Sequence, residues 1–220
     1  MEKLLSILAF TLLIAVVSIL SLRRSSFSPG PLWPSIKNAK RAPWTLIEFL
    51  SLHPSQHNRG EHYLFSEEQV RSFAHRFIGR FDGAVLHWEE APILDALIEH
   101  KFPVNHLPGK MKPEDLFQAG LYSLALAESG VSCKSARLVT VYCLQDTAKQ
   151  CLQDRLRRNC WNCGDARVFK RKFNPDEIRK HLKRLDEVWY NRRLPRASPS
   201  ETGCTVCPFS TSGECNYSAV

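Results

Sequence analysis

The sequence predicts an α/β (α+β) domain with a central mixed sheet flanked by helices, preceded by a transmembrane helix. Two observations favour the domain: short apolar runs bounded by turn residues, as in strands, and helix-start signals between them. Helices and strands that alternate around one core are typical of these fold classes. A third observation, the uncharged apolar run from Leu4 to Leu22, predicts the membrane helix.

The composition limits both the class of protein and the class of partner. Of the 220 residues, 44% are hydrophobic and 24% are charged, which excludes a collagen-like, low-complexity or wholly disordered chain. Lys and Arg number 30 against 22 Asp and Glu, so the net charge is +8. This excess excludes an acidic protein and favours a polyanionic partner, either nucleic acid or an anionic membrane surface.

The run Leu4–Leu22 is long enough to cross a bilayer, because a helix of this length spans about 28 Å. A cleaved signal peptide and a buried core helix are alternatives, but Arg23 and Arg24 stand where a small-residue cleavage site would be expected. Since most flanking cations follow the run, the positive-inside rule predicts a single-pass membrane protein with its C-terminal domain in the cytoplasm. The chain then divides into an anchor at 1–24, a linker at 25–42, a domain at 43–200 and a cysteine-rich tail at 201–220.

Two central segments are predicted to form an antiparallel strand pair. Residues 79–87 and 93–101 both have strand patterns, and the short connection between them favours antiparallel pairing. Side chains two apart share a face of a strand, so Glu99 and Lys101 project together and His100 projects from the other face. Correct pairing would bring Asp82 near the first two. Because buried charges are costly unless paired or bound to a metal, this arrangement suggests a site.

A helix at 114–128 follows, with acidic residues in its first turn. Gln118 and Tyr122 are four residues apart and therefore lie on one helical face. Further along, Asn174 starts a second helix as its N-cap, and an apolar stripe from Ile178 to Trp189 predicts its buried face. The remaining segments are a strand at 138–144, an insertion or loop at 146–166 and a strand at 167–173.

The ordered series GRFDG, IEHK and QAGLY resembles the PD-(D/E)XK nuclease superfamily, and most closely the RecB-like branch that includes the CRISPR-associated exonucleases. In that branch an Asp in a first strand is followed by an E-x-K strand and a Q-x-x-x-Y helix. The resemblance covers about residues 43–217 and implies a restriction-endonuclease-like core. The matching positions in this sequence are Asp82, Glu99, Lys101, Gln118 and Tyr122.

The resemblance implies a metal-dependent nuclease that hydrolyses phosphodiester bonds of DNA. Asp82 and Glu99 would hold Mg²⁺ or Mn²⁺, which favour hard oxygen ligands. Lys101 would orient the attacking water and stabilise developing negative charge. Gln118 and Tyr122 would position the lysine or the DNA. The alternative for Glu99 and Lys101 is an ordinary surface salt bridge.

The same branch places a histidine upstream of the Asp as a further metal ligand. Four histidines precede Asp82, and His62, in the segment RGEHYLF, best fits the pattern. It stands closer to Asp82 than is usual in the family. The alternative for each of these histidines is an ordinary solvated side chain.

The cysteines predict a second metal centre. Cys204, Cys207 and Cys215 form a C-x₂-C-x₇-C cluster, and Cys160 and Cys163 form a further C-x₂-C pair. Two such pairs are able to hold tetrahedral Zn²⁺. The resemblance implies a [4Fe–4S] cluster instead, bound by three C-terminal cysteines and one near the N-terminus. No cysteine precedes Cys133, so a cluster would take its fourth thiolate from the C-x₂-C pair; unliganded cysteines are the third alternative.

The segment 167–196 concentrates the positive charge, with eleven Lys and Arg against four Asp and Glu. Such a segment favours a nucleic acid, here DNA, as the partner. A solvated helix face and attachment to anionic lipid are the alternatives. The functions left open beside the nuclease are a nuclease-fold protein that binds nucleic acid without cutting it, and a membrane-tethered zinc or iron–sulfur scaffold.

Overall fold

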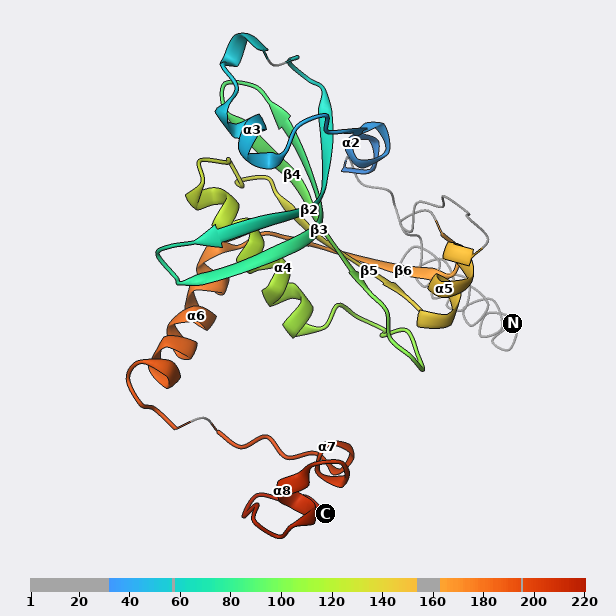
Figure 1. Cartoon of the computed structure of the whole chain (residues 1–220), viewed down its shortest axis with the longest axis vertical. Coiled ribbons are helices and arrows are strands. Elements are labelled where there is room, and N and C mark those ends of the chain that lie inside the picture. The colour runs from blue at the N-terminus through green and yellow to red at the C-terminus, as the bar shows by residue number, and fades with distance from the viewer. Residues whose placement is uncertain (1–31, 57, 154–162, 195) are drawn as a thin grey trace, which may run out of the picture. The chain divides into compact units, whose positions relative to one another are not determined.

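The computed structural model describes residues 32–56, 58–153, 163–194 and 196–220 (Figure 1). The chain divides into two compact units, one ending at Phe173 and the other running from Asn174 to Val220. This division falls inside the segment 43–200. The helices and strands of the first unit are α2 (Leu32–Asn38), β1 (Lys40–Arg41), α3 (Leu46–Ser51), the 3₁₀ turn η1 (Pro54–Gln56), β2 (His62–Ser72), β3 (Phe77–Trp88), β4 (Pro92–Lys101), α4 (Pro113–Glu128), β5 (Arg137–Cys143), α5 (Gln145–Gln153) and β6 (Ala166–Lys172).

The first unit is built on one six-stranded mixed sheet. Its strand order is β1-β2-β3-β4-β5-β6, the order of the sequence. The pairs β1–β2 and β4–β5 are parallel, whereas the other three are antiparallel. Helix α4 supplies the crossover that a parallel pair needs between β4 and β5. The prediction of an α/β chain with a central mixed sheet flanked by helices is confirmed.

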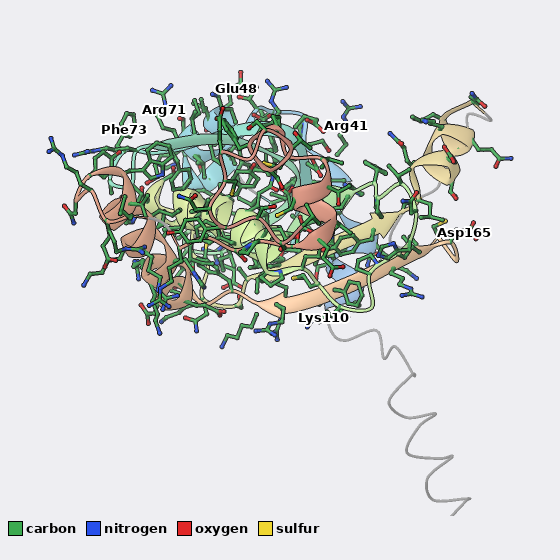
Figure 2. The ribbon with its side chains drawn as sticks, turned by 90° about the horizontal axis from the view of Figure 1, so that it is seen from below. Arg41, Glu48, Arg71, Phe73, Lys110 and Asp165 are labelled. Atoms are coloured by element: carbon green, nitrogen blue, oxygen red, sulfur yellow. The ribbon has the colours of Figure 1, made fainter. Side chains whose placement is uncertain are left out.

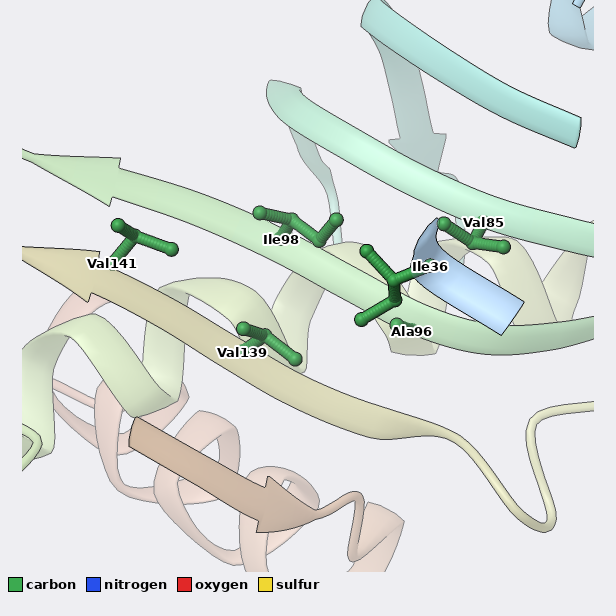
Figure 3. Close-up of a cluster of buried hydrophobic side chains, with 6 residues drawn as sticks. All are labelled: Ile36, Val85, Ala96, Ile98, Val139 and Val141. Carbon is green, nitrogen blue, oxygen red and sulfur yellow. The ribbon is translucent and has the colours of Figure 1, made fainter. Parts of the chain in front are cut away.

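Helices cover the two faces of this sheet. Ile36 of α2 packs on one face against Val85, Ala96 and Ile98, with Val139 and Val141 in the same cluster (Figure 3). Neighbouring residues of a strand point to opposite faces, so Glu99 and Lys101 project from the face opposite to this cluster. Helix α4 lies on that second face, because its Gln118 contacts Lys101. Glu99 and Lys101 therefore lie between the sheet and α4.

The predicted strands and the helix at 114–128 are confirmed to within two residues at each end. The predicted insertion or loop at 146–166 was wrong in its first part, because α5 forms there. None of the residues of this helix is buried, so it does not contribute to the core. Strand β2 was not predicted; its centre carries the polar residues Ser66, Glu67 and Glu68.

The second unit contains α6 (Pro175–Trp189), α7 (Glu201–Thr205) and α8 (Pro208–Thr211). The Asn174 side chain accepts hydrogen bonds from the N–H groups of Asp176 and Glu177, which confirms the predicted N-cap. Ile178 and Leu182 are buried, as the apolar stripe predicts, but Trp189 at its end is 76% exposed. The prediction that Trp189 belongs to the buried face was therefore wrong.

The predicted membrane helix Leu4–Leu22 lies outside the described residues. No helix in the part of the chain that the structure describes is long and apolar enough to cross a bilayer. The first residues of the linker lie outside the described residues as well, and its last part contains α2 and β1.

Candidate active site

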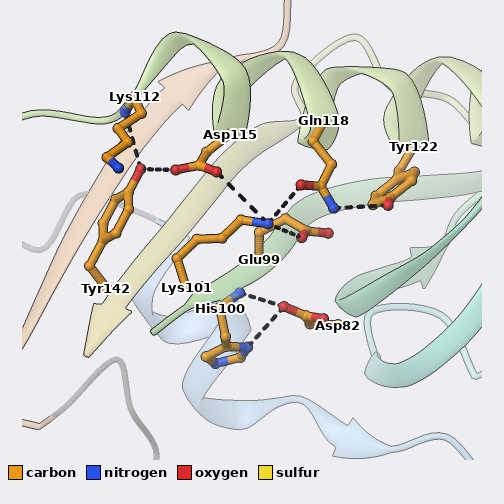
Figure 4. Close-up of polar contacts among 9 residues, drawn as sticks. All are labelled: Asp82, Glu99, His100, Lys101, Lys112, Asp115, Gln118, Tyr122 and Tyr142. Atoms are coloured by element: carbon orange, nitrogen blue, oxygen red, sulfur yellow. Dashed lines mark hydrogen bonds and ion pairs between the residues drawn. The ribbon is translucent and has the colours of Figure 1, made fainter. Parts of the chain in front are cut away.

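Asp82 of β3 and Glu99 of β4 lie just beyond the end of the β3–β4 pairing. The paired residues of this ladder end at Gly83 and Ile98, one residue from each of the two carboxylates. Beyond that point the backbone N–H of His100 donates to Oδ2 of Asp82 instead of to a strand carbonyl (Figure 4). The strands thus part at the residues that the sequence singled out.

Glu99 is a buried carboxylate with one unsatisfied oxygen. The residue is 1% exposed, and its Oε2 lies 3.4 Å from Nζ of Lys101. Its Oε1 has no hydrogen-bond partner among the described residues. Burial and the negative charge of Asp82 together raise the pKa of Glu99 to about 7. The pair is therefore not the surface salt bridge that was the alternative reading.

Asp82 has the opposite electrostatic environment. Burial acts to raise the pKa of its carboxyl group, but hydrogen bonds from the ring and the backbone of His100 outweigh burial and lower it. Nδ1 of His100 lies 3.6 Å from Oδ2 of Asp82. The ring thus reaches Asp82 although His100 alternates with Glu99 along the strand. Asp82 is consequently ionised at neutral pH, whereas the pKa of its neighbour Glu99 is raised.

Helix α4 holds Lys101 in place. Nζ of Lys101 donates to Oε1 of Gln118 at 2.7 Å, and Nε2 of Gln118 donates to the hydroxyl of Tyr122 at 2.9 Å (Figure 4). Residues four apart lie one turn apart on a helix, so one face of α4 supplies both contacts. The structure therefore brings Asp82, Glu99, Lys101, Gln118 and Tyr122 together at one site.

Asp115 is a site residue that the sequence analysis did not single out. Its Oδ1 lies 3.8 Å from Nζ of Lys101, and its Oδ2 accepts from the hydroxyl of Tyr142, which in turn accepts from the backbone N–H of Lys112. Asp115 precedes Gln118 by three residues and so belongs to the same helical face. That spacing was the available signal, but an acid in the first turn of a helix is common for other reasons.

Gly79 makes room for Tyr122. A Cβ atom at this position would overlap Cε1 of the Tyr122 ring. Alanine is ordinarily favoured over glycine inside a strand, yet Gly79→Ala should destabilise the protein by about 1–3 kcal/mol, because the added methyl group would overpack against the Tyr122 ring. Gly109→Ala is the matched control because an added Cβ there meets nothing within 4 Å. Equal denaturation midpoints for Gly79→Ala and the wild type would contradict this.

The donor set fits a hard divalent cation. Carboxylate oxygens are the ligands that Mg²⁺ and Mn²⁺ prefer, and the free Oε1 of Glu99 beside the Asp82 carboxylate offers them. A buried acceptor without a partner costs stability. A bound cation would remove that cost and the repulsion between the two carboxylates, so the residues present fit the metal that the resemblance implies.

His62 does not join this group. It lies opposite His87 in the β2–β3 ladder, and His87 is an odd number of residues from Asp82 on the same strand, so the two histidines project from the other face of the sheet. Nδ1 of His62 contacts Oδ2 of Asp95 at 2.8 Å instead. The assignment of His62 as a ligand together with Asp82 and Glu99 is therefore corrected.

The five cysteines proposed for the second centre are only partly described. Cys160 lies outside the described residues, Cys163 is half-buried in the first unit, and Cys204, Cys207 and Cys215 lie in the second unit. Cys204 is buried and its Sγ accepts from the backbone N–H of Ala219 at 3.3 Å. Within the described ranges, the C-terminal cysteines do not form a preassembled group of three metal ligands.

The raised pKa of Glu99 predicts how stability depends on pH in the metal-free protein. The folded state keeps its proton up to about pH 7, whereas the unfolded chain loses it near 4.5. The stability that Glu99 contributes by keeping its proton in the folded state is therefore fully present below pH 4.5. This contribution is lost as the pH rises through about 7. The lowered pKa of Asp82 acts below 3.8, outside this window.

Glu99→Gln should remove this loss of stability. Denaturant unfolding in EDTA at about pH 5 and about pH 8 measures it as the difference between the two pH values in the wild type and in the variant. An identical pH dependence in both proteins would show that Glu99 titrates normally.

Comparison with known proteins does not assign this chain to a family. A scan against protein-family models found no match, and a search of curated proteins found none either.

Proposed function

We propose that this chain is a Mg²⁺- or Mn²⁺-dependent nuclease with a PD-(D/E)XK core that hydrolyses phosphodiester bonds of DNA. The observation that carries the proposal is the buried Glu99, whose Oε1 is unsatisfied while its Oε2 faces Lys101. A pair of carboxylates beside a lysine that is held by a glutamine and a tyrosine is what the resembled family uses for this reaction. The neighbouring strands supply all three charged groups from one face.

Each residue has a definable part in this reaction. When bound, the divalent ion would polarise the scissile phosphate and lower the pKa of a water molecule. Asp82 and Glu99 would hold the ion through their oxygens. Lys101, fixed by Gln118, would orient the water and face the charge that develops on the phosphate. Tyr122 and Asp115 would act through their contacts with Gln118 and Lys101.

Exposed cations support a nucleic acid as the substrate. In the first unit, Cζ of Arg71 lies 5.4 Å from the centre of the Phe73 ring, and Phe73 is 80% exposed. Figure 2 shows both side chains extending outward at the edge of the molecule. An exposed aromatic ring beside a cation is suited to stacking with a base of a single strand.

The basic segment 167–196 is divided between β6 and α6 in the structure. Arg167 is engaged locally, since its Nη1 donates to the carbonyl groups of Leu107 and Pro108 at 3.2 Å. Exposed cations of α6 remain as candidate phosphate contacts: Lys180, Lys183 and Arg184. Binding through such contacts should weaken steeply with salt.

The proposal includes two features from the sequence. The uncharged run at Leu4–Leu22 with cations on its C-terminal side supports a single-pass anchor and a cytoplasmic domain. The spacing of Cys204, Cys207 and Cys215 supports a [4Fe–4S] cluster or Zn²⁺ that would order the C-terminal tail.

The test is cleavage of labelled single- and double-stranded DNA by the full-length protein. Products should appear with Mg²⁺ or Mn²⁺ and should be absent with EDTA. If the protein binds DNA but cuts neither substrate with either metal, the non-catalytic nucleic-acid-binding function replaces the nuclease. If it neither binds nor cuts, the membrane-tethered scaffold becomes the better account.

A further inference from the structure

A second group of metal-type ligands lies on the opposite face of the sheet from the candidate active site. His62 of β2, His87 of β3 and Asp95 of β4 converge there from three adjacent strands. Oδ2 of Asp95 lies 2.8 Å from Nδ1 of His62 and 2.8 Å from Nδ1 of His87. One ligand atom of each residue lies within 4.8 Å of the other two.

Strand pairing and a β-bulge bring these three side chains close together. His62 and His87 are direct partners in the β2–β3 ladder, so their side chains share a face. On the other side of β3, Val85 pairs with Ala96 whereas Leu86 pairs with Leu94, which leaves Asp95 without a partner. Asp95 is therefore the extra residue of a β-bulge, a device that re-aims a side chain.

A neutral His87 ring is not able to donate a hydrogen bond to both of the carboxylates that it contacts. Nδ1 faces Asp95 and Nε2 lies 3.5 Å from Oε1 of Glu89, so both nitrogens face carboxylate oxygens. A neutral imidazole carries one N–H. With the proton on Nδ1, the ring donates to Asp95 and leaves Nε2 without a proton for Glu89. With the proton on Nε2, toward Glu89, the lone pair of Nδ1 points at an oxygen of Asp95, and both atoms are then able to bind a cation.

We propose that His62, His87 and Asp95 bind a divalent transition-metal ion through two Nδ1 atoms and one carboxylate oxygen. Imidazole nitrogens with one carboxylate suit Zn²⁺ and its neighbours in the first transition row, unlike the all-oxygen set of Asp82 and Glu99. Glu89 would accept from Nε2 of His87, an outer contact that fixes the tautomer of a metal-bound histidine. The charges of Asp95 and Glu89 would balance the two charges of the ion.

The site is accessible enough to load and closed enough to retain an ion. The three side chains are 26%, 13% and 16% exposed, in the order His62, His87 and Asp95. Tetrahedral zinc ligands stand about 3.3 Å apart, so small side-chain rotations would convert the present contacts into metal bonds. The ion would cross-link β2, β3 and β4.

This centre is independent of the candidate active site. His87 is five residues from Asp82 along β3, a distance of about 17 Å, and it projects from the other face. The proposed ion would stabilise the fold and would leave the reaction to the other face of the sheet.

The experiment compares the zinc bound by full-length protein and by single variants after Zn²⁺ loading and gel filtration, measured by mass spectrometry of the metal. His87→Gln and Asp95→Asn should each lose one equivalent of zinc relative to the wild type. Zn²⁺ should raise the melting temperature of the wild type more than that of either variant. His106→Gln, an exposed histidine in the loop after β4, is the matched control and should keep the full zinc content.

One further variant and one spectroscopic measurement separate this site from the others. Asp82→Asn should keep the zinc even if the nuclease proposal fails, because its carboxylate lies on the other face. After loading with Co²⁺, the absorption spectra of the wild type and His87→Gln should differ by the bands of this site. Those bands should lack the strong thiolate charge-transfer absorption that Co²⁺ bound by cysteines would produce. Equal zinc content in the wild type, His87→Gln and Asp95→Asn, with all three folded by circular dichroism, would overturn the proposal.

Discussion

Glu99→Gln should reduce metal-dependent DNA cleavage by about 10³-fold or more, and Asp82→Asn should do the same. Each change replaces a carboxylate by a neutral amide of the same shape, so it removes charge from the metal ligands with little change in packing. The ion contributes several kcal/mol of charge stabilisation in reactions of this kind, which corresponds to a loss of this size. The two substitutions therefore test whether the carboxylates of Asp82 and Glu99 hold the ion.

The measurement is the single-turnover cleavage rate across a range of Mn²⁺ concentrations. Glu90→Gln is the control, because Glu90 is an exposed carboxylate in the turn between the same two strands. Both active-site variants should still bind DNA with the salt dependence of the wild type. Cleavage by Glu99→Gln at a rate near that of the wild type would remove the observation on which the proposed function depends.

Lys101→Ala should lower the cleavage rate by about 10²–10³-fold while leaving Mn²⁺ binding intact. The ammonium group is not a metal ligand, so its loss removes one preorganised contact to the developing charge. Lys101→Arg should restore little of the cleavage rate. A planar guanidinium does not reproduce the compact ammonium group, which donates to Oε1 of Gln118 at 2.7 Å.

Calorimetry of Mn²⁺ binding and the single-turnover rate together separate this role from a structural one. A merely structural lysine would lower stability and metal affinity in parallel with the rate. Lys134→Ala is the matched control, since Lys134 is an exposed lysine in the connection to β5. If Lys101→Ala cuts at the rate of the wild type, the assignment of the whole motif is wrong.

The elements that carry the site were predictable because each has a strong local pattern. The strands around Asp82 and Glu99 are short apolar runs. The helix with Gln118 and Tyr122 has acidic residues in its first turn, which is a helix-start signal. The alternation of Glu99, His100 and Lys101 follows from the period of a strand alone. The contact of the His100 ring with Asp82 does not, because it depends on where the two strands part.

The position of His62 and the role of Asp115 required the three-dimensional structure. Whether a histidine upstream in the chain faces Asp82 or turns away from it depends on strand register, and a shift of one residue reverses the face. Asp115 reaches Lys101 only because α4 packs across the ends of β4 and β5. Likewise, Trp189 at the end of the apolar stripe is exposed. The sequence did not predict this exposure, because periodicity indicates which face of a helix is apolar and not where along the helix burial ends.

The bulge in β4 bears on how this strand tolerates changes of length. Without Asp95, Ala96 would follow Leu94 directly in the strand. Leu94 would still pair with Leu86 and Ala96 with Val85, and both would keep their present faces. A one-residue deletion would thus give a regular strand and remove the carboxylate that meets His62 and His87, with no other side chain reversed. A single insertion or deletion is therefore sufficient to create or abolish the group of His62, His87 and Asp95 in an otherwise unchanged sheet.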